Sequence, residues 1–328
     1  MTAQTNVGAE LRHRIGATGR FILRGVSGDV RMTATETDEA SVRDRDGRDL
    51  SEHFEVGVRE GELELVARRR FGFTIAIDNH RWGGSSETDL DVEVPARAAI
   101  VVETASGDIA TSGLLGPKKF RTASGDLTLD ATAGELDLDA VSGDVRIDAV
   151  GAIAIQGKTI SGDLRVRAPR ASRFDVSTTS GDIWLDAELS GKGPFSVRSI
   201  SGDVRLVARG ALQVEAQTIT GELISEVAHR RESMPGRKVL TVGRAGGPTF
   251  AFKSVSGDLQ IVEPREEQVP DDMTDTDFTD RAGGPEPTTG SPAADPSETA
   301  RLEILRDLER GDIDVETATE RLAALEEA

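Results

Sequence analysis

TASGDLTL, residues 122–129, contains the tripeptide that organises this chain. Ser-Gly-Asp occurs eight times in the 328 residues, and two relatives, Ala-Gly-Glu and Thr-Gly-Glu, bring the set to ten. The tripeptides begin at Ser27, Ser106, Ser124, Ser142, Ser161, Ser180, Ser201 and Ser256, and the relatives begin at Ala133 and Thr220. From Ser106 to Thr220 the spacings, leaving out the Ala133 relative, are 18, 18, 19, 19, 21 and 19 residues. So regular a period is the signature of a repeat architecture.

Short alternating segments flank each tripeptide. Val, Ile or Leu follows every one of the ten acids, and in most repeats a second apolar residue comes two positions later, as in Leu127 and Leu129. Similar segments lead into the tripeptide, as in Phe120-Arg121-Thr122. A period of two predicts strands with one inward face, and Gly at the corner supplies a backbone conformation that a side chain would penalise.

A unit of about 19 residues with two short strands cannot bury its own apolar face, but stacked units can, at about 4.8 Å from coil to coil. The pattern therefore predicts an all-β fold, a β-solenoid of stacked two-strand coils. The alternative is an antiparallel meander or sandwich with Ser-Gly as a two-residue hairpin turn. Hairpins have no reason to hold a constant period, which favours the solenoid.

Composition divides the chain into three parts. Residues 1–262 are the predicted solenoid, with 1–95 as irregular N-terminal coils or a cap. Residues 263–296 hold ten acids, two bases and six of the twelve prolines, which predicts a disordered acidic linker rich in Pro and Gly. Residues 297–328 change to a period of 3.6 and predict a helical hairpin. Because so small a hairpin is only marginally stable alone, we expect it to bind a protein partner or to self-associate.

The Ser-Gly-Asp series, with Val92-Glu93-Val94-Pro95 ahead of its regular part, resembles a bacterial family of adhesin-type proteins, domain of unknown function 4097. The resemblance covers roughly residues 20–262. The tail, from Arg301 through Gly311 to Leu322, is similar to the short helical (SHOCT-like) segment often joined to such domains. The resemblance implies a β-solenoid-type fold, no established enzyme activity and, through some relatives, a link to cell-envelope stress.

Charge and composition exclude several classes of protein. The net charge is −19, but residues 263–296 contribute −8 and residues 297–328 contribute −6, so 1–262 is only −5. The sequence shows no cluster of basic residues of the kind that binds nucleic acid, so we do not expect a nucleic-acid-binding protein. The chain has no Cys, which excludes disulfides and thiolate metal sites. We see no signal peptide and no apolar run near the 20 or so residues that span a membrane, so we expect a cytoplasmic protein without membrane insertion.

The tripeptides place a row of glycines and acids at one corner of the solenoid. We expect these residues to be structural, with each carboxylate accepting bonds from corner N–H groups and from the neighbouring Ser hydroxyl. A weak calcium-binding ladder is the alternative, although no metal site is predicted. The corner residues are Gly107, Asp108, Gly125, Asp126, Gly143, Asp144, Gly162, Asp163, Gly181, Asp182, Gly202, Asp203, Gly257 and Asp258, with Glu222 in the Thr220 relative.

A candidate binding strip lies on the strands after the corner. Arg146, Arg165, Trp184 and Arg205 occupy the same outward position in consecutive repeats, and Arg121, Lys158 and Arg198 take an outward position on the strands before the corner. Such a strip could hold an acidic or planar ligand through cation–π and bidentate contacts, and the acidic residues 263–328 are one candidate occupant. The alternative is a solvated face whose Arg stems cover the sheet.

No catalytic residues and no cofactor are predicted, since the four His residues are scattered and no phosphate-binding loop occurs. We therefore interpret the chain as a non-enzymatic scaffold or sensor. Its solenoid face would bind a partner or ligand, and its helical hairpin would mediate assembly. A surface adhesin and a carbohydrate-active enzyme on a β-helix are the alternatives.

Overall fold

The computed structural model describes residues 8–68, 74–77, 80–83, 88–234, 237–242 and 246–264. Within these ranges the chain is almost entirely β, with one short helix, α1 (Leu50–His53), and a small separate hairpin of β7 (Thr74–Ile77) and β8 (His80–Gly83). Residues 265–328 lie outside them, so the linker, the helical hairpin and the SHOCT-like resemblance stay predictions. No helix of the described ranges is both long enough and apolar enough to span a membrane.

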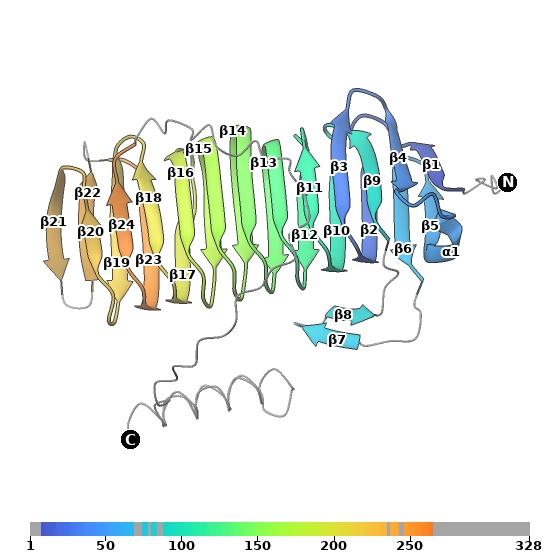
Figure 1. Cartoon of the computed structure of the whole chain (residues 1–328). Helices are drawn as coiled ribbons and strands as arrows, with labels where there is room; N and C mark the ends of the chain where they lie inside the picture. The colour runs from blue at the N-terminus through green and yellow to red at the C-terminus, as the bar shows by residue number, and fades with distance from the viewer. Residues whose placement is uncertain are drawn as a thin grey trace, which may run out of the picture. The chain divides into compact units, whose positions relative to one another are not determined.

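Strands that lead into the tripeptide corners form one sheet, here sheet I (Figure 1). In spatial order it contains β5 (Phe54–Arg59), β6 (Glu62–Ala67), β2 (Arg20–Ser27), β10 (Ala99–Ser106), β12 (Lys118–Thr122), the second halves of β13 (Leu127–Ala140), β14 (Val145–Lys158) and β15 (Leu164–Ser177), then β17 (Phe195–Ser201), β23 (Thr249–Ser256), β19 (Leu212–Thr218), β22 (Arg237–Val242) and β21 (His229–Met234).

Strands that leave the corners form the opposite sheet, sheet II. In spatial order it contains β1 (Glu10–Arg14), β4 (Glu39–Asp44), β9 (Leu90–Pro95), β3 (Val30–Thr35), β11 (Ile109–Ser112), the first halves of β13, β14 and β15, then β16 (Ile183–Leu189), β18 (Val204–Ala208), β24 (Leu259–Val262) and β20 (Leu223–Ser225). β13, β14 and β15 each bend from sheet II into sheet I at the second, looser corner of the coil.

Neighbouring strands of the stack pair in parallel, one repeat apart. Lys118 pairs with Leu136, and Leu127 pairs with Val145, 18 residues further along in each case. Parallel pairing at the repeat spacing is what stacked coils require, whereas a meander would pair successive strands antiparallel. The predicted all-β solenoid is confirmed, and the meander is wrong.

Spatial order departs from chain order near both ends. The coil of β23 and β24 lies between the coil of β17 and β18 and the coil of β19 and β20 (Figure 1). At the other end, the coil of β2 and β3, which contains the Ser27 tripeptide, stacks directly on β10 and β11. Antiparallel strands close both ends of sheet I, and β1 and β4 close the N-terminal end of sheet II. The other end of sheet II is the three-residue β20, which pairs in parallel with β24.

The core consists of apolar ladders that run along the stack. In sheet II the first inward residue after each corner is Val, Ile or Leu and is at most 4% exposed. This ladder contains Leu90, Val30, Ile109, Leu127, Val145, Leu164, Ile183, Val204, Leu259 and Leu223. The ladders of both sheets belong to one continuous cluster, so each coil buries its apolar face against its neighbours.

The corner glycines stack so closely that no side chain fits between the coils. A Cβ added to Gly162 would lie 2.2 Å from the carbonyl oxygen of Gly143, and the φ of Gly162 is 104°. The same approach recurs from Gly107 to Gly257. From Gly107 to Gly202 two constraints therefore select Gly, a left-handed backbone and the short distance between coils, whereas at Gly257 the short distance acts alone.

Changing Gly162→Ala is expected to destabilise the protein far more than changing Gly210→Ala. Gly210 has nearly the same φ, 100°, but nothing lies within 4 Å of its added Cβ. Backbone strain alone costs about 1–2 kcal/mol, and overpacking against the next coil adds about 1–3 kcal/mol, for a total of about 2–5 kcal/mol. Urea unfolding of both variants measures the difference. Equal losses would show that the φ constraint acts alone.

One inward ladder of sheet I contains a charged residue. Lys118 lies between Ile100 and Leu136 in the stack and is only 3% exposed. Its Nζ donates a hydrogen bond to the carbonyl oxygen of Ala133 at 2.5 Å. Burial lowers the pKa of Lys118 to about 8, because the charged ammonium loses its hydration in the apolar ladder.

This pKa makes stability depend on pH in alkaline solution. Below pH 8 the folded protein bears the full cost of a buried ammonium. Between about pH 8 and about pH 10.4 only the unfolded chain stays protonated, so stability rises with pH, by up to about 3 kcal/mol. The chain has no Cys or Tyr to titrate in that window. Urea unfolding at a series of pH values measures the rise, which Lys118→Met is expected to abolish. A rise that persists in Lys118→Met would assign it to other groups.

Candidate ligand-binding face

A continuous ladder of side-chain to backbone hydrogen bonds runs along the acid corner. In each coil the Asp carboxylate accepts the N–H of the equivalent acid in the next coil, as Asp144 Oδ1 does from the Asp163 N–H at 2.9 Å. The nine bonds measure 2.7–3.0 Å and connect Asp89, Asp29, Asp108, Asp126, Asp144, Asp163, Asp182, Asp203, Asp258 and Glu222 in that spatial order. The corner carboxylates therefore bind the backbone of the neighbouring coil, which is a structural role.

The serine of the tripeptide makes a different bond from the one predicted. Ser142 Oγ donates to the carbonyl oxygen of Ala123 at 3.2 Å, and Ser161 Oγ donates to that of Val141 at 3.4 Å. The expected bond from the hydroxyl to the carboxylate is wrong, because the Asp side chain already points along the stack to the next N–H. Both polar residues of the motif thus connect adjacent coils.

The acid ladder does not converge on a point. Among the described residues, no three His, Asp or Glu side chains are grouped so that they could hold a metal ion. The acids lie in a line, one per coil, so each carboxylate faces the next coil and not a common centre.

The predicted strip on sheet II lies in register. Arg146 pairs with Arg165, Arg165 pairs with Trp184, and Trp184 pairs with Arg205, so the four occupy consecutive coils. Gln260 continues the row beyond Arg205, whose Nη2 donates to it at 3.1 Å. The structure therefore brings together the four strip residues of sheet II.

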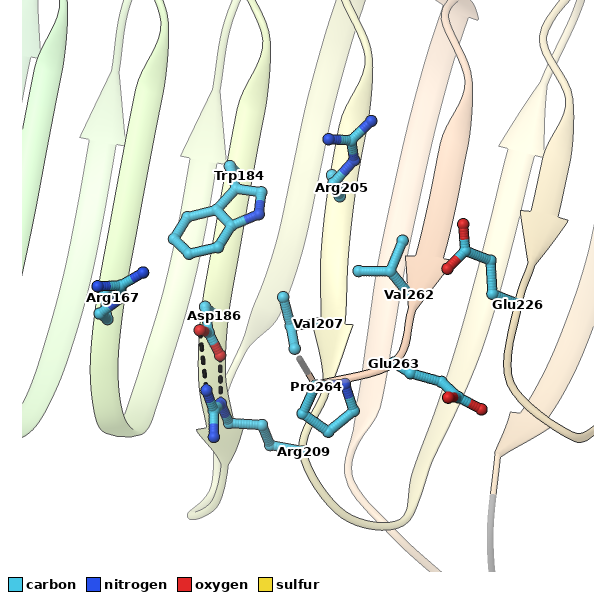
Figure 2. Close-up of a pocket in the computed structure, with 10 residues that line it drawn as sticks. All are labelled: Arg167, Trp184, Asp186, Arg205, Val207, Arg209, Glu226, Val262, Glu263 and Pro264. Atoms are coloured by element: carbon cyan, nitrogen blue, oxygen red, sulfur yellow. Dashed lines mark hydrogen bonds and ion pairs between the residues drawn. The ribbon is translucent and has the colours of Figure 1, made fainter. Parts of the chain in front are cut away.

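Trp184 is half-buried at the centre of the strip, with two guanidinium groups near its ring. Arg165 Cζ lies 4.8 Å from the ring centroid, and Arg167 Cζ lies 5.7 Å from it. Arg165 forms no ion pair with any residue that the structure describes. Figure 2 shows the indole ring between Arg167 and Arg205, above the strand that also carries Asp186. The ring and its cations form a surface suited to a flat anion.

A hollow of about 650 Å³ opens on one side of Trp184 (Figure 2). Its apolar lining consists of Trp184, Val207, Val262 and Pro264, its cations are Arg167, Arg205 and Arg209, and its acids are Asp186, Glu226 and Glu263. Asp186 is only 6% exposed and is held by the Arg209 guanidinium. The hydrogen bond to Asp186 raises the pKa of Arg209. With that pair neutralised, Arg167 and Arg205 are the remaining cations that line this hollow, and Glu226 and Glu263 are its remaining acids.

A second hollow, of about 500 Å³, lies on the corner side of the strip. The strip arginines border it on one side and four carboxylates of the acid ladder border it on the other. Its mixed lining makes it a poorer place for an anion than the first hollow, where Val207 and Val262 lie beside the ring.

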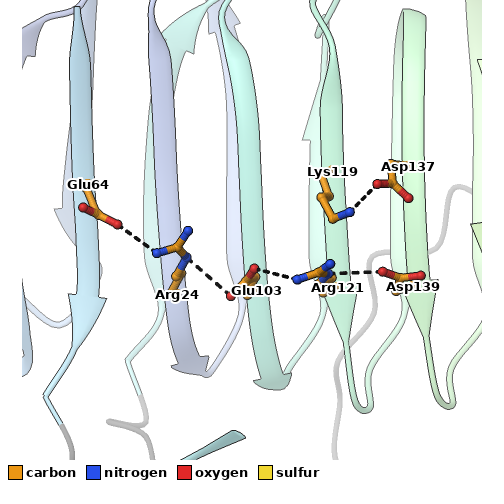
Figure 3. Close-up of polar contacts among 7 residues, drawn as sticks. All are labelled: Arg24, Glu64, Glu103, Lys119, Arg121, Asp137 and Asp139. Atoms are coloured by element: carbon orange, nitrogen blue, oxygen red, sulfur yellow. Dashed lines mark hydrogen bonds and ion pairs between the residues drawn. The ribbon is translucent and has the colours of Figure 1, made fainter. Parts of the chain in front are cut away.

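On sheet I, unlike on sheet II, acidic and polar residues separate the predicted basic residues from one another. Arg121, Lys158 and Arg198 do share one outward row, but Asp139 and Ser177 alternate with them. Arg121 is paired on both sides, with Glu103 at 3.2 Å and Asp139 at 3.1 Å. The row continues through Arg24 to Glu64, and Lys119 pairs with Asp137 beside it (Figure 3). The structure thus neutralises Arg121 and does not join the three basic residues into one patch.

Sequence analysis missed the second row of sheet II. Arg167, Asp186, Val207 and Val262 occupy the outward position two residues after the strip and line the hollow. The period of two that placed Trp184 outward places these residues outward as well. The signal was therefore present, but the Asp186–Arg209 pair joins side chains 23 residues apart and follows from no spacing rule.

Substitutions at Asp144 separate the hydrogen bond of the acid ladder from its charge. Asp144→Ala removes the acceptor of the Asp163 N–H, at a cost of about 1 kcal/mol. Asp144→Asn keeps an acceptor oxygen and removes a like charge from the row, where each neighbour repels it by about 0.9 kcal/mol in a water-like medium. We expect Asp144→Asn to be at least as stable as the natural protein in urea unfolding. A loss equal to that of Asp144→Ala would show that the charge itself is needed.

A family model described as Toastrack DUF4097 matches residues 20–262, about three quarters of the chain. No curated protein matches the chain. A solved "putative adhesin" from Bacteroides fragilis is 12% identical, with 78% of this chain and 97% of that chain covered and a TM-score of 0.43.

Two further solved structures come from Parabacteroides distasonis. A "putative adhesin" is 14% identical, with 78% of this chain and 97% of that chain covered and a TM-score of 0.42. A "putative lipid binding protein" is also 14% identical, with 79% and 98% covered and a TM-score of 0.36. Likenesses this distant carry no function from one chain to another.

Proposed function

The chain belongs to the Toastrack DUF4097 family, and from this premise we propose that it is a non-enzymatic binding protein whose ligand lies on sheet II over Trp184. One observation carries the proposal: the contrast between the two outward faces of the solenoid. On sheet I the row from Glu64 to Asp139 alternates in sign and pairs its charges. On sheet II the cations around Trp184 face a ring and a hollow.

The lining of the hollow indicates the chemistry of the ligand. Trp184, Val207 and Val262 offer a flat apolar surface, and Arg167 and Arg205 stand at its edge. Glu226 and Glu263 line the same hollow and disfavour a second negative charge there. We therefore propose a flat or ring-shaped ligand with one anionic end, held by stacking and by guanidinium hydrogen bonds.

Naphthalene sulfonates test this proposal, because they combine one ring system with a chosen number of anions. We expect 2-naphthalenesulfonate to bind more tightly than inorganic phosphate, which has no ring, and than 2,6-naphthalenedisulfonate, whose second sulfonate approaches the two glutamates. Equilibrium dialysis with the full chain measures the three affinities. Trp184→Ala and Arg205→Ala are each expected to weaken 2-naphthalenesulfonate about tenfold, the loss of about 1.4 kcal/mol.

Arg173→Ala is the matched control, since Arg173 is an exposed arginine on the sheet I half of β15. It should leave all three affinities unchanged. Equal losses in Arg173→Ala and Arg205→Ala would reduce the binding to general charge attraction and overturn the proposal. So would disulfonate binding as tight as monosulfonate binding.

We also propose a cytoplasmic location, a scaffold or sensor role, a link to cell-envelope stress, and assembly through residues 297–328. Reducing-end release from polysaccharides would be the sign of the carbohydrate-active alternative. Cell fractionation separates a surface adhesin from an intracellular protein.

A further inference from the structure

An exposed apolar ridge runs along the tripeptide corner, separate from the strip on sheet II. In five coils the residue just before the tripeptide, or before its Thr220 relative, forms this ridge, and the large members there are exposed: Ile160 by 47%, Ile200 by 54%, Val255 by 47% and Ile219 by 79%. Thr179 occupies the same position between Ile160 and Ile200. Four large apolar side chains at one repeat position are not scattered surface residues but one continuous feature.

Backbone bonds place these residues in adjacent coils. The Ser180 N–H donates to the Ile160 carbonyl at 2.9 Å, and the Ser201 N–H donates to the Thr179 carbonyl at 2.9 Å. Val255 lies beside Ile200, since the residues flanking each are paired. The Thr220 N–H donates to the Val255 carbonyl at 3.1 Å, which puts Ile219 last. The ridge therefore spans five coils, about 19 Å from first to last at a spacing of about 4.8 Å.

Opposite charges line the two sides of the ridge. On the sheet II side runs the acid ladder, with Asp163, Asp182, Asp203, Asp258 and Glu222 in the same five coils. On the sheet I side, two residues before the ridge, stand Lys158, Arg198 and Lys253. Arg198 pairs with Asp175 at 3.3 Å, whereas Lys158 and Lys253 form no ion pair with any side chain that the structure describes.

We propose that this corner is a self-association surface and that its occupant is the same corner of a second copy of the chain. A two-fold axis parallel to the stack would lay ridge on ridge. The acid ladder of each copy would then face the basic row of the other, because the rotation exchanges the two sides. An axis across the stack would instead bring the two acid ladders together. Charge complementarity thus selects both the occupant and its orientation.

The size of the ridge determines how strong the contact can be. A ridge one residue wide and five coils long, with its flanking charges, falls at the low end of specific interfaces, which bury about 1,200–2,000 Å² in total. We therefore expect a reversible dimer whose population depends on protein concentration.

Sedimentation equilibrium of the full chain, from about 1 µM to about 200 µM, measures this association across the micromolar range. The expected result is a monomer–dimer equilibrium. Ile200→Asp, at the centre of the ridge, should weaken it at least tenfold. The charge variant Lys158→Glu with Lys253→Glu should do the same while the ridge stays apolar.

Two matched controls keep the result specific. Val150 is 64% exposed but lies at the looser corner, so Val150→Asp adds the same charge away from the ridge. Arg173→Glu reverses a charge on sheet I outside the basic row. Both should leave the dissociation constant unchanged, and circular dichroism checks that every variant is folded. A natural chain that stays monomeric throughout, or a dimer that survives Ile200→Asp, overturns the proposal. The second outcome would place self-association elsewhere, as in residues 297–328.

Discussion

The short distance between glycines of adjacent coils is the constraint on which the rest of this structure depends. Each corner Gly lies against the carbonyl oxygen of the equivalent Gly one coil away, with no room for a Cβ. Parallel backbone bonds then hold the strands in register over every repeat. Since the register cannot slip without moving the corner, a side chain at any repeat position lies beside its own equivalent. Each repeat position thus becomes a line along the solenoid.

Rows of equivalent residues allow each coil to bury its apolar side chains, but they also place like charges next to one another. An inward position filled with Val, Ile or Leu gives a continuous core, but an outward position filled with one charge gives a row of like charges about 4.8 Å apart. The chain answers this differently at different positions. The acid ladder gives each carboxylate a backbone N–H. The row through Arg24 and Arg121 alternates in sign. The strip around Trp184 interrupts its arginines with an aromatic ring. Arg146 pairs with Asp148 and Arg205 donates to Gln260, whereas Arg165 lies against the ring without an ion pair to any described residue.

Sequence reasoning reached the parts of this molecule that depend on the period. The coil length, the inward ladders and the consecutive placement of Arg146, Arg165, Trp184 and Arg205 all follow from counting residues between tripeptides. It did not reach the spatial order of the last coils, because β23 can stack between β17 and β19 without any change in the local pattern. Nor did it reach the pairing of Arg121 with Glu103 and Asp139. To predict that pairing, all residues at the same position of successive coils have to be compared, and the prediction considered only the basic residues of the row.

The same reasoning explains why the proposed ligand face and the proposed self-association edge can coexist on so small a cross-section. Sheet II and the tripeptide corner are different positions of one repeat, so they lie on separate lines along the stack, with the acid ladder between them. That ladder is fixed by its role in stacking, since each carboxylate accepts the N–H of the next coil. Ile160, Ile200 and Val255 lie on one side of it and Arg165, Trp184 and Arg205 lie on the other. A ligand over Trp184 would therefore leave the ridge uncovered, and a dimer at the ridge would leave the hollow open to solvent, so binding at one line need not compete with binding at the other.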